Sequence, residues 1–247
     1  MAVENGAGLA GTEGKEVTEQ ISPGVLYLVA TPIGNLADIT HRAIEILAAV
    51  DIVAAEDTRH SRVLFAHHGI HPKRLEAYHS HNLESRTGHL VRELVAGASV
   101  ALISDAGTPG ISDPGAVLVK AAVEAGITIC PIAGASAPIL AVTASGFPSH
   151  SFIYEGFIPR KKGRRTLFES WKTEERTVVF FESGVRLVKT LEQMAEILGP
   201  RKVCVAREMT KKFEEFLRGD IAQVIEELGR RGEVKGEVTV VLAPEGF

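Results

Sequence analysis

Cysteine is scarce in this sequence of 247 residues, and long apolar runs are absent. The two cysteines, Cys130 and Cys204, each lie inside a short apolar run, which predicts buried thiols in a reducing, cytoplasmic compartment rather than a disulfide framework. No run approaches the roughly 18 continuous apolar residues of a membrane span. The Gly- and Glu-rich start lacks the basic and apolar regions of a secretory signal. Residues 1–22 are therefore predicted to form a disordered tail, and no membrane partner is expected.

Two common nucleotide-binding motifs are missing from the expected loops after strands. No G-x-G-x-x-G follows an expected strand, and the G-K-[ST] of a P-loop is absent, which speaks against NAD and ATP. The net charge of −4 speaks against a wholly basic nucleic-acid binder. Residues 150–247, however, hold 18 Lys and Arg against 16 Asp and Glu, whereas residues 1–149 hold 9 against 15. A polyanion is therefore expected to bind to a limited part of the second half of the chain, where positive charge is in excess.

Short apolar runs alternate with segments of helical periodicity, which is typical of α/β proteins. The expected strands are 25–30, 52–55, 100–103, 127–132, 177–181, 202–206 and 238–242. The expected helices are 40–49, 83–95, 114–125, 187–198 and 221–230. Near residue 150 the sequence becomes rich in proline, glycine and aromatic residues, followed by a basic burst. We therefore predict two α/β domains, residues 23–146 and residues 147–247.

Four loops rich in small residues follow the expected strands of the first half. They are ATPIGN (30–35), AEDTR (55–59), SDAGTPG (104–110) and AGASA (133–137). In an open α/β sheet, ligands bind outside the carboxyl ends of the strands, so these loops predict one binding crevice. Glycine allows a ligand to approach the backbone closely. The alternative is that the four loops are only tight turns between strands and helices.

Five motifs in a fixed order carry a family resemblance: ATPIGNL, AEDTR, SDAGTPGISDPG, AREMTKKFEE, and KGE before the last expected strand. Over residues 24–245 the chain resembles the RsmI family of ribosomal RNA small subunit methyltransferases, within the tetrapyrrole methylase superfamily. The resemblance implies a homodimer with the two-domain class III methyltransferase fold, and S-adenosylmethionine as methyl donor in the interdomain cleft. It also implies methyl transfer to the ribose 2′-OH of a decoding-centre cytidine of 16S rRNA in the 30S subunit. The chain departs from the family pattern at Ala30, at Ala133 and at Gly184-Val185, where the family has Gly, Pro and Pro-His.

The cofactor contacts are likewise implied by the resemblance. They are Ile33, Ala106, Gly107, Thr108, Ile111, Ser136 and Ala137 from the first domain, with Glu182 and Met209 from the second. Asp105 either bonds to the cofactor or shapes its turn as an Asx residue. The small residues among these positions agree with a close approach of the cofactor to the backbone.

The AEDTR loop carries the candidates for catalysis. A ribose hydroxyl is a poor nucleophile until its proton leaves, so a general base or a neighbouring cation is expected. Glu56 is the favoured base, by analogy with an acidic residue at this position elsewhere in the superfamily. Asp57 is the second candidate, and Arg59 would orient a carboxylate or bind phosphate. The alternative is that Asp57 caps a helix and Arg59 pairs with it.

The segment RKKGRR (160–165) has five basic residues in six positions and follows Tyr154 and Phe157. Cations with nearby aromatic rings suit an RNA backbone and an unstacked base. The predicted RNA-binding residues are Lys161, Lys162, Arg164 and Arg165, with Arg207 and Lys211 from AREMTKKFEE, where glutamates nearly cancel the charge. The alternative is a solvated, mobile loop without a ligand.

Two further functions compete with the rRNA methyltransferase. One is a methylase of a corrinoid or porphyrin precursor, and the other is a non-catalytic RNA-binding protein of ribosome assembly. The basic segment favours RNA over a macrocycle, and the four loops favour an enzyme. Seven of the nine histidines fall between His60 and His89, but no cysteine or carboxylate cluster joins them, so no metal site is expected.

Overall fold

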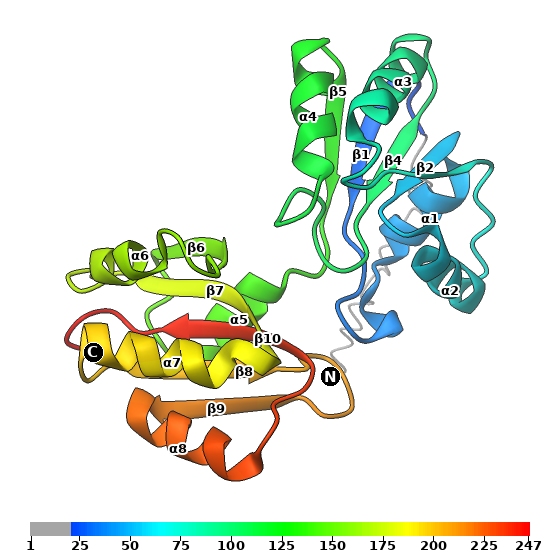
Figure 1. Ribbon diagram of the computed structural model, residues 1–247. Helices are drawn as coiled ribbons and strands as arrows, with labels where there is room; N and C mark the ends of the chain where they lie inside the picture. Colours follow the sequence, from blue (N-terminus) through cyan, green and yellow to red (C-terminus); the bar gives the residue numbers. More distant parts are fainter. Residues whose placement is uncertain (1–20) are drawn as a thin grey trace, which may run out of the picture.

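The computed structural model describes residues 21–247, so residues 1–20 of the predicted tail lie outside the described part. The chain forms two sheets, each covered by helices, and the two domains lie side by side (Figure 1). The first is drawn in blue to green and the second in green to red. Among the described helices, none is both long and apolar enough to cross a membrane.

The first sheet is wholly parallel, with the order β3-β2-β4-β1-β5. Its strands are β1 (Val25–Val29), β2 (Ile52–Ala55), β3 (Leu75–Ala77), β4 (Val100–Ile103) and β5 (Thr128–Ile132). The helices around it are α1 (His41–Ala49), α2 (Thr58–His68), α3 (Leu83–Val95) and α4 (Gly115–Glu124), with a short 3-10 helix at Leu36–Asp38. Strands β2 and β4 are buried throughout, because α1 and α2 cover one face of the sheet and α3 and α4 the other.

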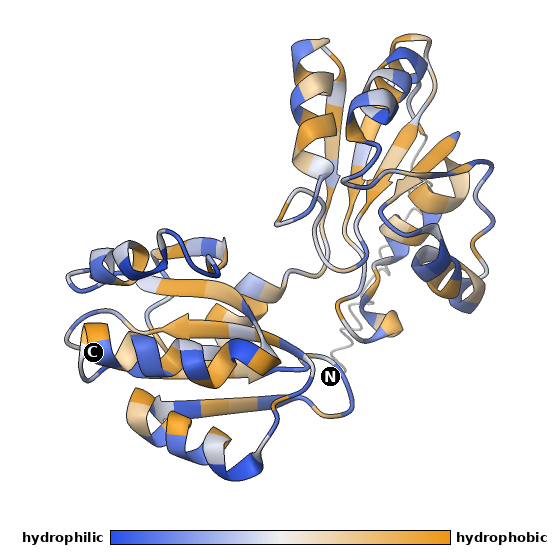
Figure 2. Cartoon of the chain, viewed as in Figure 1, coloured by the Kyte–Doolittle hydropathy of each residue, from blue (hydrophilic) through white to orange (hydrophobic). Residues whose placement is uncertain are grey.

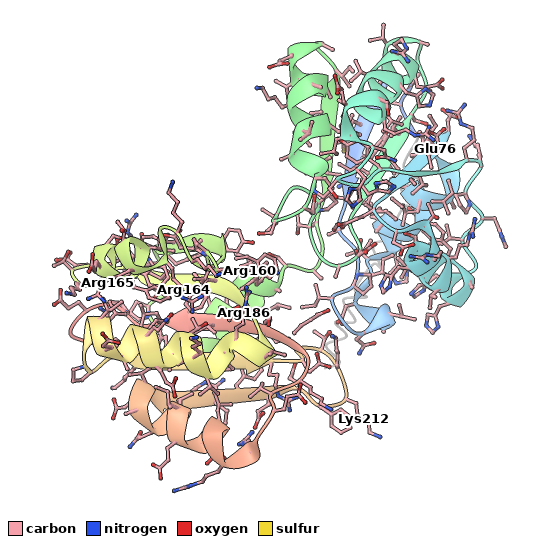
Figure 3. The ribbon with its side chains drawn as sticks, in the orientation of Figure 1. Glu76, Arg160, Arg164, Arg165, Arg186 and Lys212 are labelled. Carbon is pink, nitrogen blue, oxygen red and sulfur yellow. The ribbon has the colours of Figure 1, made fainter. Side chains whose placement is uncertain are left out.

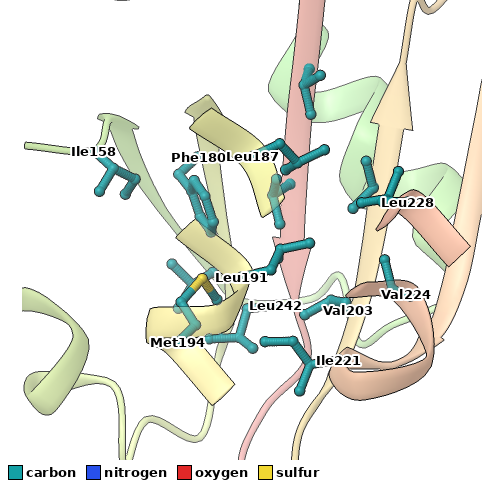
Figure 4. Close-up of a cluster of buried hydrophobic side chains, with 14 of the residues drawn as sticks. Ile158, Phe180, Leu187, Leu191, Met194, Val203, Ile221, Val224, Leu228 and Leu242 are labelled. Atoms are coloured by element: carbon teal, nitrogen blue, oxygen red, sulfur yellow. The ribbon is translucent and has the colours of Figure 1, made fainter. Parts of the chain in front are cut away.

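The second sheet is mixed, with the order β6-β7-β10-β8-β9. Its strands are β6 (Phe152–Phe157), β7 (Thr177–Ser183), β8 (Lys202–Arg207), β9 (Glu215–Asp220) and β10 (Glu237–Leu242). The helices α6 (Arg164–Ser170), α7 (Gly184–Leu198) and α8 (Ile221–Arg231) pack on one face through a single apolar cluster (Figure 4). Apolar strands lie inside and polar helix faces lie outside (Figure 2).

Helix α5 (Ala137–Ser145) covers the other face of the second sheet. Its Ala141 and Val142 are buried against Val179 and Val241, which alternate along β7 and β10 with the residues that face α7. The sequence-based boundary at 146/147 assigned this helix to the first domain. Because α5 packs on the second sheet, we propose that the boundary lies in the 133–136 segment before it.

Several expected elements have the observed bounds, including β2, β4 and α3. Thr40 caps α1 by accepting a hydrogen bond from the backbone N–H of Ala43. The strand β3 was not expected, because three residues are too few to show a pattern. Helix α5 was not expected either, because it is apolar on most sides and has almost no helical periodicity.

Candidate active site

The carboxyl ends of β2, β4, β1 and β5 are neighbours in the first sheet, so the four loops that follow them lie together. They border a cavity of about 720 Å³ between the two domains, which is the size of a small-molecule or cofactor site. The predicted crevice is therefore present. Its opposite wall comes from the second domain, from the end of β7, the start of α7 and the segment 233–239.

Seven of the predicted cofactor contacts line this cavity, six implied by the resemblance and Asp105 besides. They are Ile33, Asp105, Ala106, Ile111, Ala137, Glu182 and Met209. Ile33 and Met209 also share one buried apolar cluster, although one comes from each side of the cleft. The cavity wall is thus continuous across the two domains.

Gly107, Thr108 and Ser136 do not line the cavity but lie in the loops that shape it. Gly107 exchanges two backbone hydrogen bonds with Thr31, at 3.0 and 2.9 Å, and has φ +83°, a conformation that favours glycine. The Thr108 hydroxyl donates to the carbonyl of Ala135 at 3.0 Å, which ties the β4 loop to the β5 loop. These two residues fix the spacing of adjacent loops, and Ser136 begins α5 as its N-cap.

Glu56 lines the cavity at the end of β2. Burial raises the pKa of its carboxyl above the usual range, and the negative charge of Asp105 adds to this rise. The backbone N–H of Asp105 lies 3.5 Å from Glu56 Oε2, and Asp105 Oδ1 accepts a hydrogen bond from the backbone N–H of Asp57 at 2.9 Å. A carboxylate with a raised pKa is suited to accept a proton near neutral pH.

Asp57 and Arg59 lie outside the cavity lining. Asp57 is the N-cap of α2 and accepts a hydrogen bond from the backbone N–H of Arg59 at 2.8 Å. The Arg59 guanidinium binds the same carboxylate with two nitrogens, at 3.1 and 2.8 Å, and holds the pKa of Asp57 well below its usual range. The geometry therefore favours the capping alternative for Asp57, and leaves Glu56 as the loop's cavity-facing carboxylate.

The sequence of this chain is similar to those of known methylases. Residues 25–225 match the family model of the Tetrapyrrole (Corrin/Porphyrin) Methylases. The chain belongs to this family. Proteins named ribosomal RNA small subunit methyltransferase I include one from Mesorhizobium japonicum, 52% identical over 89% of this chain and 75% of its own length. The protein of that name from Thermotoga maritima is 46% identical over 89% of this chain and 98% of its own length.

Solved structures of other enzymes share the fold. A diphthine synthase has a TM-score of 0.69 at 18% identity, covering 89% of this chain and 90% of its own. The cobalt precorrin-4 methyltransferase CbiF has a TM-score of 0.61 at 17% identity, covering 89% of this chain and 95% of its own. The predicted class III methyltransferase fold is confirmed.

Tetrapyrrole methylases use S-adenosylmethionine as methyl donor, and the residues of this cavity fit that cofactor. Ala106 and Ala137 leave room beside the backbone, and Ile33 and Met209 offer an apolar surface for an adenine ring. A Cβ on Gly107 would lie in van der Waals contact with Ile33 Cγ2, at 3.4 Å, so this glycine borders the same surface. The carboxylate of Asp105 suits a ligand that carries positive charge.

Glu182 lines the cavity wall, but its side chain is fully buried in an ion network. It pairs with Arg186 at 2.5 Å and with Arg164 at 3.6 Å, and it accepts a hydrogen bond from the Thr190 hydroxyl at 2.7 Å. A buried carboxylate held by two guanidinium groups is a structural anchor of the wall.

Arg164 differs from the other residues of the basic segment, which were predicted together to bind RNA. It is 8% exposed and donates to Gln193 at 2.7 Å and to the carbonyl of Pro159 at 3.2 Å, besides its pairing with Glu182. Its charge therefore faces the interior of the second domain rather than an RNA backbone. Figure 3 shows Arg164 beside α6, with Arg160, Arg165 and Arg186 on the same part of the domain.

The other predicted RNA-binding residues divide into two groups. Lys161, Lys162 and Arg165 are exposed at the start of α6. Arg207 is half-buried and bound to Glu215 at 3.2 Å, and Lys211 lies between Glu208 and Glu237, at 3.1 Å from each. The exposed group can meet a polyanion, and within it Arg165 also pairs with Glu169 at the surface, at 3.0 Å. The second group is held by carboxylates and is less exposed.

Sequence reasoning missed the segment 233–239, which forms much of the second-domain wall. Gly236 has φ +96°, and a Cβ there would lie 2.5 Å from Glu208 Oε1. That same oxygen accepts a hydrogen bond from the backbone N–H of Glu237 at 2.9 Å. The KGE motif is the signal that could have located this wall, because its glycine admits the Glu208 side chain.

The histidine-rich part of the chain was not expected to bind metal. Across residues 21–247, no group of three or more His, Cys, Asp or Glu side chains has the arrangement of a metal site. His68 instead bonds to the carbonyl of Leu36 at 2.8 Å, and His89 lies 3.1 Å from Glu76. These two histidines therefore make structural contacts within the first domain.

Proposed function

We propose that this chain is a methyltransferase that uses S-adenosylmethionine to methylate the ribose 2′-OH of a decoding-centre cytidine of 16S rRNA in the 30S subunit. The observation that carries the proposal is the near-complete match to proteins named ribosomal RNA small subunit methyltransferase I, at 46–52% identity in two species. The cofactor-sized cavity and the exposed cations of the second domain support the same reading.

The cofactor would be held by the β1, β4 and β5 loops and by Met209, and it supplies an electrophilic methyl group on a sulfonium. Glu56 would accept the 2′-OH proton as the oxygen attacks. The loops would position the ribose hydroxyl beside the bound cofactor, and such positioning is worth roughly 7–11 kcal/mol of the barrier. Asp105 would hold the loop beside Glu56 through its hydrogen bond to the backbone of Asp57.

Two competing functions predict different ligands. A methylase of a corrinoid or porphyrin precursor binds a polycarboxylate macrocycle and gains nothing from cations outside the cleft, so exposed Lys161, Lys162 and Arg165 favour RNA. A non-catalytic assembly protein needs no base in a cavity, so the raised pKa of Glu56 favours an enzyme.

The test uses radiolabelled S-adenosylmethionine and 30S subunits from a strain that lacks this modification. After incubation, the 16S rRNA is digested and the labelled nucleotide is mapped; we expect 2′-O-methylcytidine in the decoding centre. Cofactor binding without label in rRNA would point to a small-molecule acceptor instead. Failure to bind the cofactor in calorimetry would favour the assembly protein.

We also propose that the protein acts as a cytoplasmic homodimer, as the family resemblance implies. The absence of a membrane-crossing helix from residues 21–247 is compatible with this location. Analytical ultracentrifugation of the purified full chain tests the dimer, because a monomer and a dimer differ twofold in mass.

A further inference from the structure

The mouth of the cavity carries an unusual group of exposed apolar side chains. Ile111 is 41% exposed, Phe157 is 59% exposed and Val185 is 78% exposed, and all three line the cavity. Phe157 is the aromatic residue among them. Large apolar side chains that remain exposed around a cavity mark a place where a ligand or partner binds.

The ring of Phe157 packs against a second aromatic ring, which in turn packs against a third. Its centroid lies 5.2 Å from that of Phe181 at an angle of 55°, and Phe181 contacts Tyr154 edge to face at 5.5 Å. The register of β6 on β7 shifts between Tyr154 and Phe157, where Gly156 has φ +68°. The pairing resumes after this irregularity, with Phe157 opposite Phe181, and the Phe157 side chain remains exposed.

Charge identifies the kind of ligand that fits this surface. The chain leaves β6 at Phe157 and within five residues presents Arg160, Lys161 and Lys162, all exposed. Arg165 is exposed in the first turn of α6. An exposed aromatic ring followed closely in the chain by exposed cations matches an unpaired nucleotide, whose base stacks on the ring while its phosphates meet the cations.

We propose that Phe157 is the stacking platform for the base of the acceptor nucleotide, with Ile111 and Val185 as the apolar sides of this subsite. The inference rests on the proposed function and adds the residue that holds the base. Glu56 lies on the first-domain side of the same cavity and Phe157 on the second-domain side. A nucleotide stacked on Phe157 would therefore place its ribose between the two domains.

The test compares Phe157→Trp, Phe157→Leu and Phe157→Ala in methylation of 30S subunits, with Phe247→Ala as the control at another exposed phenylalanine. Loss of base stacking lowers kcat/KM by about 5- to 150-fold in the Ala variant. We expect a smaller loss in the Leu variant, near-normal activity in the Trp and control variants, and unchanged cofactor affinity in all of them.

The Phe157→Trp variant also gives a direct readout. The natural chain has one tryptophan, Trp171, which is 2% exposed. The introduced indole is therefore the accessible fluorophore, and 30S subunits should quench it. Full activity of Phe157→Ala, or a loss of cofactor affinity equal to its loss of activity, would overturn the inference while leaving the proposed function intact. If the wild-type chain transfers no methyl group to 30S subunits, both fail.

Discussion

The hydroxyl oxygen of Ser112 lies 2.6 Å from the hydroxyl oxygen of Tyr154, which joins the β4 loop of the first domain to β6 of the second. Ser112 has φ +63°, a left-handed conformation that costs free energy for a residue with a side chain. The contact holds the loop that carries Ile111 against the strand that carries Phe157.

This contact predicts an activity loss without unfolding. Ser112→Ala and Tyr154→Phe each remove one hydrogen bond, worth about 0.5–1.5 kcal/mol, so kcat/KM for 30S methylation should fall about 2- to 10-fold in each. The double variant should lose no more than either single variant, because both changes remove the same interaction. Additive losses would show that the two hydroxyls act separately.

Glu56→Gln tests the general base. The variant should bind the cofactor normally in calorimetry and lose most of its single-turnover rate, since an amide cannot accept the 2′-OH proton. In the wild type the rate should rise with pH through the raised pKa of Glu56, because the base acts when deprotonated. Asp57→Asn is the matched control, since Asp57 lies outside the cavity lining. An unchanged rate in Glu56→Gln would exclude Glu56 as the base.

The same substitution should stabilise the folded protein at neutral pH. The folded-state pKa of Glu56 is raised, so the folded protein favours the protonated carboxyl, and stability is lost as pH rises through that pKa. Glu56→Gln removes this penalty and should raise Tm at neutral pH. The difference should vanish below the ordinary pKa of a glutamate. Glu84→Gln, at an exposed site on α3, is the control and should show no such dependence.

The buried network predicts a stability loss at Glu182. Glu182→Gln removes the charge that compensates Arg164 and Arg186, and the free energy of unfolding should fall by about 3 kcal/mol in denaturant titrations. Glu169→Gln breaks an exposed pair with Arg165 at 3.0 Å and should change stability by less than about 1 kcal/mol. Equal effects of the two variants would contradict the buried anchor.

Salt dependence tests the exposed cations. Replacing Lys161, Lys162 and Arg165 together by Ala should weaken binding to 30S subunits and reduce the slope of log K against log salt by about 2, since each single-strand phosphate contact contributes about 0.7. Lys73→Ala with Lys120→Ala removes exposed positive charge from the first domain and should leave the slope unchanged. An unaltered slope in the triple variant would show that these cations do not meet phosphate.

The sequence by itself determined the alternation of strands and helices in the first domain and the ligand-binding edge of its sheet. Runs such as 52–55 and 100–103 are apolar throughout because both faces of β2 and β4 are covered, and this pattern is local. The loops after the strands could be found because turns and close backbone approach require glycine and other small residues. The fixed order of the five motifs indicated the family.

Only the tertiary structure decided which of two chemically similar neighbouring side chains is buried or faces the cavity. Arg164 and Arg165 are neighbours in a run of like charges, yet packing of α6 on α7 buries the first and exposes the second. Asp57 and Glu56 are adjacent carboxylates, yet the start of α2 turns one toward Arg59 while the other meets the cavity. Such differences arise from contacts between residues far apart in the chain, which local periodicity and composition do not encode.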